Sequence, residues 1–296
     1  LITWNVAEQD PPPDLNTLLQ LPPPLGQSLP DLYIIGLQEI GSLRFTKWKP
    51  AFKKALAEHG YKKVKSNRLY VLSGIMIQVF ALEKHLEFIN KVETGSIALG
   101  IAKILGNKGA TSVRLNLYNM PTCFVNLHLA AHEKGFNERL DQMLYAERYQ
   151  SFTKTEVDTI FKNDLVFWLG DLNFRLHQDL NLSVEDIKDH IREKQLDKLF
   201  EHDEINRMMK NGGFFQKLQE ADIKFPPSFK FKLGTNDYVT NRRPAWTDRI
   251  LYRDSEKVNI TPISYKSVEE YMVSDHKPVI GEFEISIKVY SLSVRL

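Results

Sequence analysis

Short, nearly continuous apolar runs recur along the whole chain, and each is bounded by polar residues, Gly or Pro. Runs of this kind are typical of β-strands that are buried on both faces. Helical patterns separate some of them, whereas the last three runs leave no room for a crossover helix and should be antiparallel. The sequence therefore predicts a mixed-sheet α/β sandwich with helices outside. The expected strands are residues 1–6, 31–40, 69–82, 111–129, 165–169, 246–253, 258–264 and 278–290, and the expected helices are 50–60, 138–154 and 183–211, the last with breaks.

The composition is that of an ordinary globular protein, with 43% apolar and 26% charged residues among 296. It excludes a disordered tail, a collagen and a coiled coil. No repeat, low-complexity tract or linker interrupts the pattern, so we expect a single domain over residues 1–296. Because the sequence begins with Leu1 rather than Met, we expect this domain to be excised from a longer chain.

Charge and cysteine content narrow the class of protein further. The 39 Lys and Arg against 37 Asp and Glu leave a net charge of +2, which argues against a nucleic-acid-binding protein. The single cysteine, Cys123, cannot form an intrachain disulfide, which suits a reducing compartment such as the cytosol. The apolar runs are too short to span a bilayer.

Polar side chains stand directly beside several of the predicted strands. A lone carboxylate there is usually a solvated turn residue, and a lone histidine is more often a core residue. Repeated in one chain, such positions predict side chains that converge on one cleft from a rigid scaffold. The residues are Asn5, Glu39, His128, the pair Asp171 and Asn173, and the pair Asp275 and His276.

These residue types suit metal-assisted attack of water on phosphorus. Asn5 and Glu39 offer hard oxygen ligands, which favour Mg²⁺, and the scattered histidines lack the spacing of a zinc site. Asp171 is a candidate base for the water. The remaining candidates are Asn173, His128 and His276 as donors to an oxyanion, Asp248 to fix a histidine tautomer, and Lys108 in a flexible Gly-Asn-Lys-Gly loop as a phosphate contact.

Several segments in a fixed order resemble the inositol polyphosphate 5-phosphatases. Trp168–Arg175 and Pro244–Ile250 are the most specific of them, while Gly-Asp-Leu-Asn and Ser-Asp-His also occur in related nucleases and sphingomyelinases. The resemblance implies the endonuclease/exonuclease/phosphatase fold, a deoxyribonuclease-like, two-layered mixed β-sheet sandwich flanked by helices. The other matching segments are Thr3–Val6, Gly36–Glu39, Gly106–Ala110, Asn126–His132 and Ser274–Pro278.

The resemblance also implies an activity and a role for each candidate. The expected reaction is Mg²⁺-dependent hydrolysis of the 5-phosphate of phosphoinositides, such as phosphatidylinositol 4,5-bisphosphate or 3,4,5-trisphosphate, and of soluble inositol polyphosphates. Glu39 would bind the metal with Asn5 beside it, and Asp171 would activate the attacking water in line. The phosphate contacts would be Asn173, His128 and His276, the last held beside Asp275 and steered by Asp248.

Specificity for the neighbouring 4-phosphate would come from Lys230 and Arg242, which match basic stretches of the family. Phe229 stands where many relatives carry Tyr, and Thr240 where some carry Lys, so the grip on that phosphate is expected to be weaker. The alternative, that Lys230 and Arg242 are ordinary solvated charges, stays open.

Residues 97–105 form an apolar segment directly before the Gly-Asn-Lys-Gly loop. Beside a phosphate site, its Ile101, Ile104 and Leu105 would touch acyl chains of a membrane lipid. A short buried helix explains the same composition equally well. With a lipid substrate, we expect a monomeric catalytic domain that is cytoplasmic and peripheral at membranes.

Two other functions compete with the phosphatase. A nuclease of the same superfamily is disfavoured by the near-neutral charge and by the family-specific segments. A catalytically inactive lipid-binding module is disfavoured because every residue that the reaction requires is present.

Overall fold

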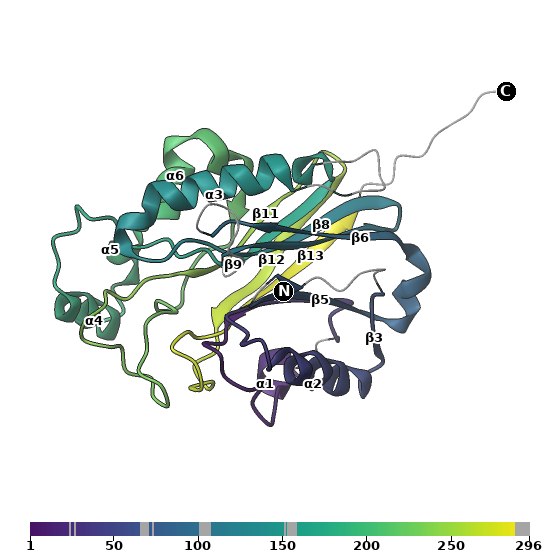
Figure 1. Cartoon of the computed structure of the whole chain (residues 1–296), viewed down its shortest axis with the longest axis horizontal. Coiled ribbons are helices and arrows are strands. Elements are labelled where there is room, and N and C mark those ends of the chain that lie inside the picture. The colour runs from purple at the N-terminus through teal and green to yellow at the C-terminus, as the bar shows by residue number, and fades with distance from the viewer. Residues whose placement is uncertain are drawn as a thin grey trace.

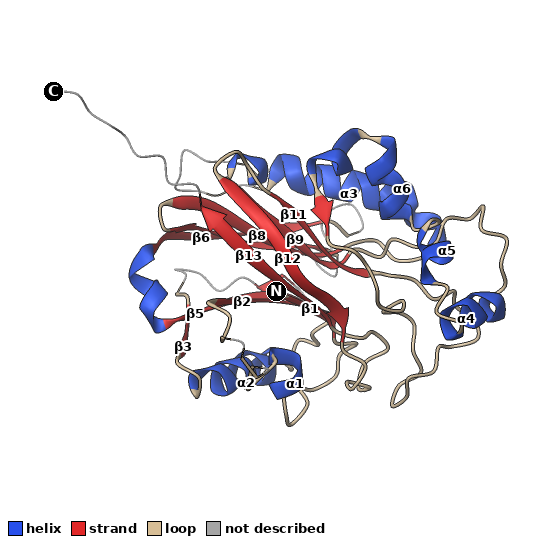
Figure 2. Cartoon of the chain, turned by 180° about the vertical axis from the view of Figure 1, so that it is seen from behind, coloured by secondary structure: helices blue, strands red, loops and turns tan. Residues whose placement is uncertain are grey.

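The computed structural model describes residues 1–23, 25–26, 28–65, 71–72, 74–100, 108–150, 152 and 159–287. Two β-sheets pack face to face, and helices cover their outer faces (Figures 1 and 2). The first sheet has the strand order β12-β13-β1-β2-β5-β3, with β4 paired to β5, and the second has the order β10-β11-β9-β8-β7-β6. Both mix parallel and antiparallel pairs, which confirms the predicted two-layered mixed sandwich.

The elements, in chain order, have the following bounds. The strands are β1 (Ile2–Asn5), β2 (Leu32–Gln38), β3 (Tyr61–Lys63), β4 (Val71–Leu72), β5 (Ile75–Leu82), β6 (Ile89–Ala98), β7 (Gly109–Leu117), β8 (Met120–His128), β9 (Leu165–Asp171), β10 (Gln219–Glu220), β11 (Asp248–Arg253), β12 (Val258–Ser267) and β13 (Val279–Ile287). The α-helices are α1 (Asn16–Leu19), α2 (Phe45–Ala57), α3 (Phe136–Tyr149), α4 (Val184–Arg192), α5 (Leu196–Phe200) and α6 (Glu204–Asn211). Short 3₁₀ turns lie at Glu83–Phe88, Glu133–Gly135, Ile160–Lys162 and Gly213–Lys217.

The apolar side chains form three layers that the two sheets separate. Between the sheets, Ile34 and Val79 of the first meet Phe124 and Phe167 of the second. A second cluster lies where α1 and α2 cover the first sheet, and a third lies where α3 and α6 cover the second (Figure 1). Burial on both faces explains why the central strands read as continuous apolar runs. In the described residues, no helix is long and apolar enough to cross a membrane.

The sequence and the structure differ at several elements. The predicted strand over 69–82 holds two strands, β4 and β5, and neither β3 nor β10 was predicted. The run over 111–129 holds two strands, β7 and β8, because Tyr118 and Asn119 adopt positive φ and turn the chain back. Strand β6, with polar residues at most exposed positions, was not predicted. Helix α2 begins at Phe45 rather than at Pro50, since Trp48 packs between Trp4 and Phe52.

The strand directions bring the polar residues to one edge of the sandwich. β1 runs parallel to β2, and β8 runs parallel to β9, so the carboxyl ends of each pair lie together. β11 runs antiparallel to β9 and therefore starts at this edge. Asn5, Glu39, His128, Asp171 and Asp248 stand at these strand ends.

Candidate active site

Asp171 is the centre of the site. The register of the second sheet places His128 of β8 and Asp248 of β11 on either side of it. From the first sheet, the Asn5 side chain crosses to Asp171 and donates from Nδ2 to Oδ2 at 3.0 Å. The site is therefore built at the seam between the two sheets, on rigid strand ends.

Asp171 is 1% exposed and faces two imidazoles. Nε2 of His128 lies 3.4 Å from its Oδ2, and Nε2 of His276 lies 4.0 Å from the same oxygen. Burial alone would raise the pKa of Asp171, but His276, His128 and Lys108 together hold it well below its usual range. Asp171 is thus an ionised carboxylate although it is buried.

His276 is held by Asp248. Its Nδ1 lies 2.9 Å from Oδ2 of Asp248, and that oxygen also accepts from the hydroxyls of Ser228 at 2.6 Å and Thr247 at 2.9 Å. Burial lowers the pKa of His276, but the carboxylates of Asp248 and Asp171 outweigh it and raise the pKa to about 9. With Nδ1 held in this way, Nε2 points toward Asp171 as a hydrogen-bond donor.

Glu39 and Asn5 offer the oxygen atoms for a metal. Glu39, at the end of β2 with φ of 52°, has a side chain that is 43% exposed, and its Oε1 lies 3.5 Å from Nε2 of His128. The amide oxygen of Asn5 accepts from the backbone N–H of Ala7 at 3.0 Å and keeps a second lone pair. Carboxylate and amide oxygens of this kind are the ligands that a hard divalent cation prefers.

A second group of side chains also meets the geometric condition for a metal. Ligand atoms of Asp171, Asp248 and His276 all lie within 4.8 Å of one another. However, Oδ2 of Asp248 already takes hydrogen bonds from two hydroxyls and the imidazole. Asp248 therefore already serves as the partner of His276, and Glu39 and Asn5 remain the candidate metal ligands.

Asn173 is locked by Arg175. The Arg175 guanidinium donates from Nη2 to Oδ1 and from Nε to the backbone oxygen of Asn173, and the Asn173 Nδ2 donates to the oxygen of Leu129. These contacts fix which end of the amide is a donor. One N–H of Asn173 stays available for a phosphate oxygen.

Arg175 also connects to the other side of the site. Its Cζ lies 4.6 Å from the centroid of the Phe229 ring, which in turn lies 4.4 Å from the imidazole of His276. The sequence did not single out Arg175, Thr247 or Ser228 as supporting residues. Arg175 and Thr247 stand in the two most specific matching segments and were detectable candidates, whereas Ser228 lies outside them.

The predicted substrate contacts lie in different surroundings. The ammonium of Lys108 contacts Nε2 of His128 and faces Asp171, so it belongs to the site.

Lys230 pairs with Asp275 at 2.8 Å. The Asp275 carboxylate therefore contacts Lys230, and its charge also helps to raise the pKa of His276. Arg242 is exposed and has no ion pair with the part of the chain that the structure describes. Ile101, Ile104 and Leu105 lie outside the described residues.

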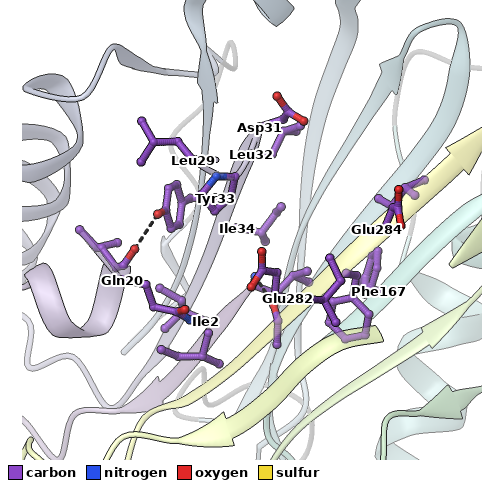
Figure 3. A pocket seen from close by; sticks show the side chains of 18 of the residues that line it. Ile2, Gln20, Leu29, Asp31, Leu32, Tyr33, Ile34, Phe167, Glu282 and Glu284 are labelled. Carbon is purple, nitrogen blue, oxygen red and sulfur yellow. Dashed lines mark hydrogen bonds between the residues drawn. The ribbon is translucent and has the colours of Figure 1, made fainter. Parts of the chain in front are cut away.

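A cavity of about 580 Å³ lies away from this site, at the start of β1 and β2 (Figure 3). Apolar side chains such as Ile2, Tyr33 and Phe167 line it, together with Glu282 and Glu284. Carboxylates over apolar walls repel phosphate. We therefore base the function on the strand-end site.

Three comparisons place the chain among known proteins. Residues 2–282 match the sequence model of the Endonuclease/Exonuclease/phosphatase family 2. Human phosphatidylinositol 4,5-bisphosphate 5-phosphatase A is 37% identical over 96% of this chain and 30% of its own length. Mouse inositol polyphosphate 5-phosphatase K is 33% identical over 97% of this chain and 65% of its own length. The chain thus spans about 30% of the length of the first curated relatives it matches.

Solved structures agree with the sequence relatives. The inositol polyphosphate 5-phosphatase domain of SPsynaptojanin, in complex with inositol (1,4)-bisphosphate and calcium, matches with a TM-score of 0.83, 31% identity, and coverage of 97% of this chain and 84% of that chain. Cimex nitrophorin, solved as a ferrous NO complex, matches with a TM-score of 0.76, 26% identity and 97% coverage of both chains. One fold therefore serves different functions, and the function must be argued from the site residues.

Proposed function

Because the chain belongs to the endonuclease/exonuclease/phosphatase family, and within it to the inositol polyphosphate 5-phosphatases, we propose that it hydrolyses the 5-phosphate of phosphoinositides and of soluble inositol polyphosphates. The observation that carries the proposal is the surroundings of Asp171, a buried carboxylate with one imidazole at 3.4 Å and another at 4.0 Å. A phosphoryl group needs such donors for its oxygens and a base for the attacking water.

The residues divide the reaction between them. Asp171 accepts a proton from the water as the water oxygen bonds to phosphorus. The bond from phosphorus to the inositol 5-oxygen, which lies in line with the new bond, breaks, and the released oxygen takes up a proton from solvent. The N–H groups of His276, His128 and Asn173 donate to the phosphoryl oxygens, where negative charge develops. Lys108 adds a positive charge on the His128 side.

Mg²⁺ is the proposed metal, held by Glu39 with Asn5 beside it. When bound, it supplies Lewis-acid stabilisation of charge on the phosphate oxygens. Calcium in the SPsynaptojanin complex supports a hard-cation site in this family. A free, buried Cys123 and a lipid substrate are consistent with a cytoplasmic domain that works at the membrane surface.

Lys230 and Arg242 remain the proposed contacts for a 4-phosphate. Lys230 would leave its ion pair with Asp275 or share its charge with the substrate. Phe229 lies against the imidazole of His276 and is therefore close to the proposed position of the reacting phosphate. A tyrosine at this position would offer a hydroxyl group there, which Phe229 lacks.

The test is a phosphate-release assay over the phosphoinositides and soluble inositol phosphates, with and without Mg²⁺. Release from substrates that carry a 5-phosphate, and none from those that lack one, is the expected result. Lipid binding without release would indicate an inactive lipid-binding module. Nicking of abasic DNA without release would indicate a nuclease.

A further inference from the structure

Positive charge is concentrated in one segment of this nearly neutral chain. Residues 45–65 carry seven lysines, one glutamate and no arginine, whereas the whole chain has a net charge of only +2. The rest of the protein is therefore net negative. Six of the seven form what we call the basic face: Lys49, Lys53, Lys54, Lys62, Lys63 and Lys65.

The fold directs these lysines outward. Helix α2 buries Trp48, Phe52 and Leu56 against the first sheet, which leaves Lys53 and Lys54 exposed on the helix. The following strand, β3, is the edge strand of that sheet and adds Lys62 and Lys63 beside the helix (Figure 1). The basic face therefore comes from two packed elements.

No described carboxylate neutralises the basic face. Lys47, which we leave out of it, pairs with Asp10 at 2.6 Å, but no side chain of the basic face has an ion pair or hydrogen bond within the described residues. Burial, together with Lys49 and Lys53, lowers the pKa of Lys63 to about 8. Like charges are thus crowded without a counter-charge, which is an arrangement that an external anion would relieve.

Protection of an edge strand explains only part of this pattern. Lysines on an exposed edge hinder pairing with another chain, which accounts for those on β3. It does not account for Lys49, Lys53 and Lys54 on α2. The absence of arginine from residues 45–65 is also informative, because arginine suits defined bidentate contacts and lysine suits diffuse attraction.

We propose that the basic face docks the protein on an anionic phospholipid surface. This inference rests on the proposed function, because a phosphoinositide substrate lies in a bilayer on which the protein must dock. Helix α2 starts close to the site, because the loop after Glu39 leads into it and Lys47 in its first turn pairs with Asp10 of the loop after β1. Lys49, the first residue of the basic face, follows two positions later, whereas Lys62 and Lys63 lie toward the other end of the sheet. A bilayer along α2 would therefore lie beside the loops after Asn5 and Glu39.

The experiment measures binding to vesicles that contain no phosphoinositide, so catalysis does not contribute. Phosphatidylcholine vesicles with and without about 30% phosphatidylserine are sedimented with the wild type and with a K53Q/K54Q/K62Q variant, whose replaced side chains are all exposed. The matched control is K194Q/K210Q/K266Q, which removes the same charge from exposed positions elsewhere. Turnover of a soluble inositol polyphosphate is measured for every variant.

We expect the basic-face variant to bind phosphatidylserine vesicles at least about tenfold more weakly, because each lysine near a charged membrane contributes several-fold to binding. Binding should weaken with salt, and soluble turnover should stay unchanged. The inference is overturned if wild-type binding is the same with and without phosphatidylserine, or if the control variant loses as much vesicle binding as the basic-face variant. Absence of soluble turnover in the wild type would instead overturn the proposed function.

Discussion

Nδ1 of His276 lies 2.9 Å from Oδ2 of Asp248, and both side chains are buried. The carboxylate fixes the ring and stabilises its charge, while Phe229 packs against the ring at 4.4 Å between centroids. The free Nε2 is thereby aimed at the space beside Asp171. The Nδ1 proton of His276 is thus fixed by Asp248, which is 28 positions away in the sequence.

The pH dependence of phosphate release should report this pair. The pKa of His276 is raised to about 9, so the imidazolium of the folded protein is lost as pH rises through about 9. Its contribution to the free energy of unfolding is fully present below about pH 6.5, the ordinary pKa of histidine, and is lost over the same rise in pH. We expect kcat/KM to fall on the alkaline side near pH 9. In Asp248→Asn this limb should move down by about 1–2 pH units, because one of the two carboxylates that raise the pKa is gone. If the alkaline limb does not move in Asp248→Asn, the ionisation of His276 does not control phosphate release.

Asp171→Asn tests the proposed base. The amide keeps the shape of the side chain but cannot take a proton, so we expect phosphate release to fall by about 10²–10⁴-fold. Thermal unfolding of the variant checks that Asn5 and His128 still hold the site together. Unchanged release from a folded variant would remove Asp171 from the role given to it here.

Arg175 is expected to act through Asn173. Arg175→Met removes the hydrogen bonds that fix the Asn173 amide, so kcat should fall by roughly 10–100-fold with little change in KM. Asn173→Ala should cost a similar factor, and the double variant no more than either, since both remove one interaction. Arg175→Lys should recover part of the rate. Additive losses would mean that the two residues act separately.

Glu39 should determine the metal requirement. Chelation with EDTA is expected to abolish phosphate release, and added Mg²⁺ to restore it. Glu39→Gln removes the charged ligand and should raise the Mg²⁺ concentration for half-maximal rate by about tenfold or more. Isothermal titration of Mg²⁺ into both proteins measures the same loss without catalysis. An equal affinity in both would place the metal at Asp171, Asp248 and His276 instead.

The sequence could predict those site residues that lie at the ends of buried strands. Asn5, His128 and Asp171 each end a buried strand, and parallel pairing brings such ends to one edge whatever the loops do. The buried runs also predict the central strands themselves, because burial on both faces leaves a continuous apolar pattern. They do not predict which strands pair.

Other parts depend on contacts that no local pattern reports. Ser228 reaches Asp248 only because the loop after β10 folds back over the start of β11. Strand β6 is a polar edge strand and has no apolar run to reveal it. Helix α2 starts before Pro50 because the packing of Trp48 against Trp4 outweighs the local preference.

Gly170, directly before the proposed base, should be essential for the fold at this point. Its φ is 147°, and a Cβ there would stand 2.1 Å from the backbone oxygen of Leu127, its partner on β8. Backbone cannot move aside as a flexible side chain can, so Gly170→Ala should lower the free energy of unfolding by about 3 kcal/mol or more. Gly60→Ala is the matched control, because Gly60 has φ of 82° but no atom within 4 Å of the added Cβ. It should cost only about 1 kcal/mol, from backbone strain alone. Urea unfolding of both variants compares the two costs, and equal values would show that β8 and β9 tolerate the extra atom.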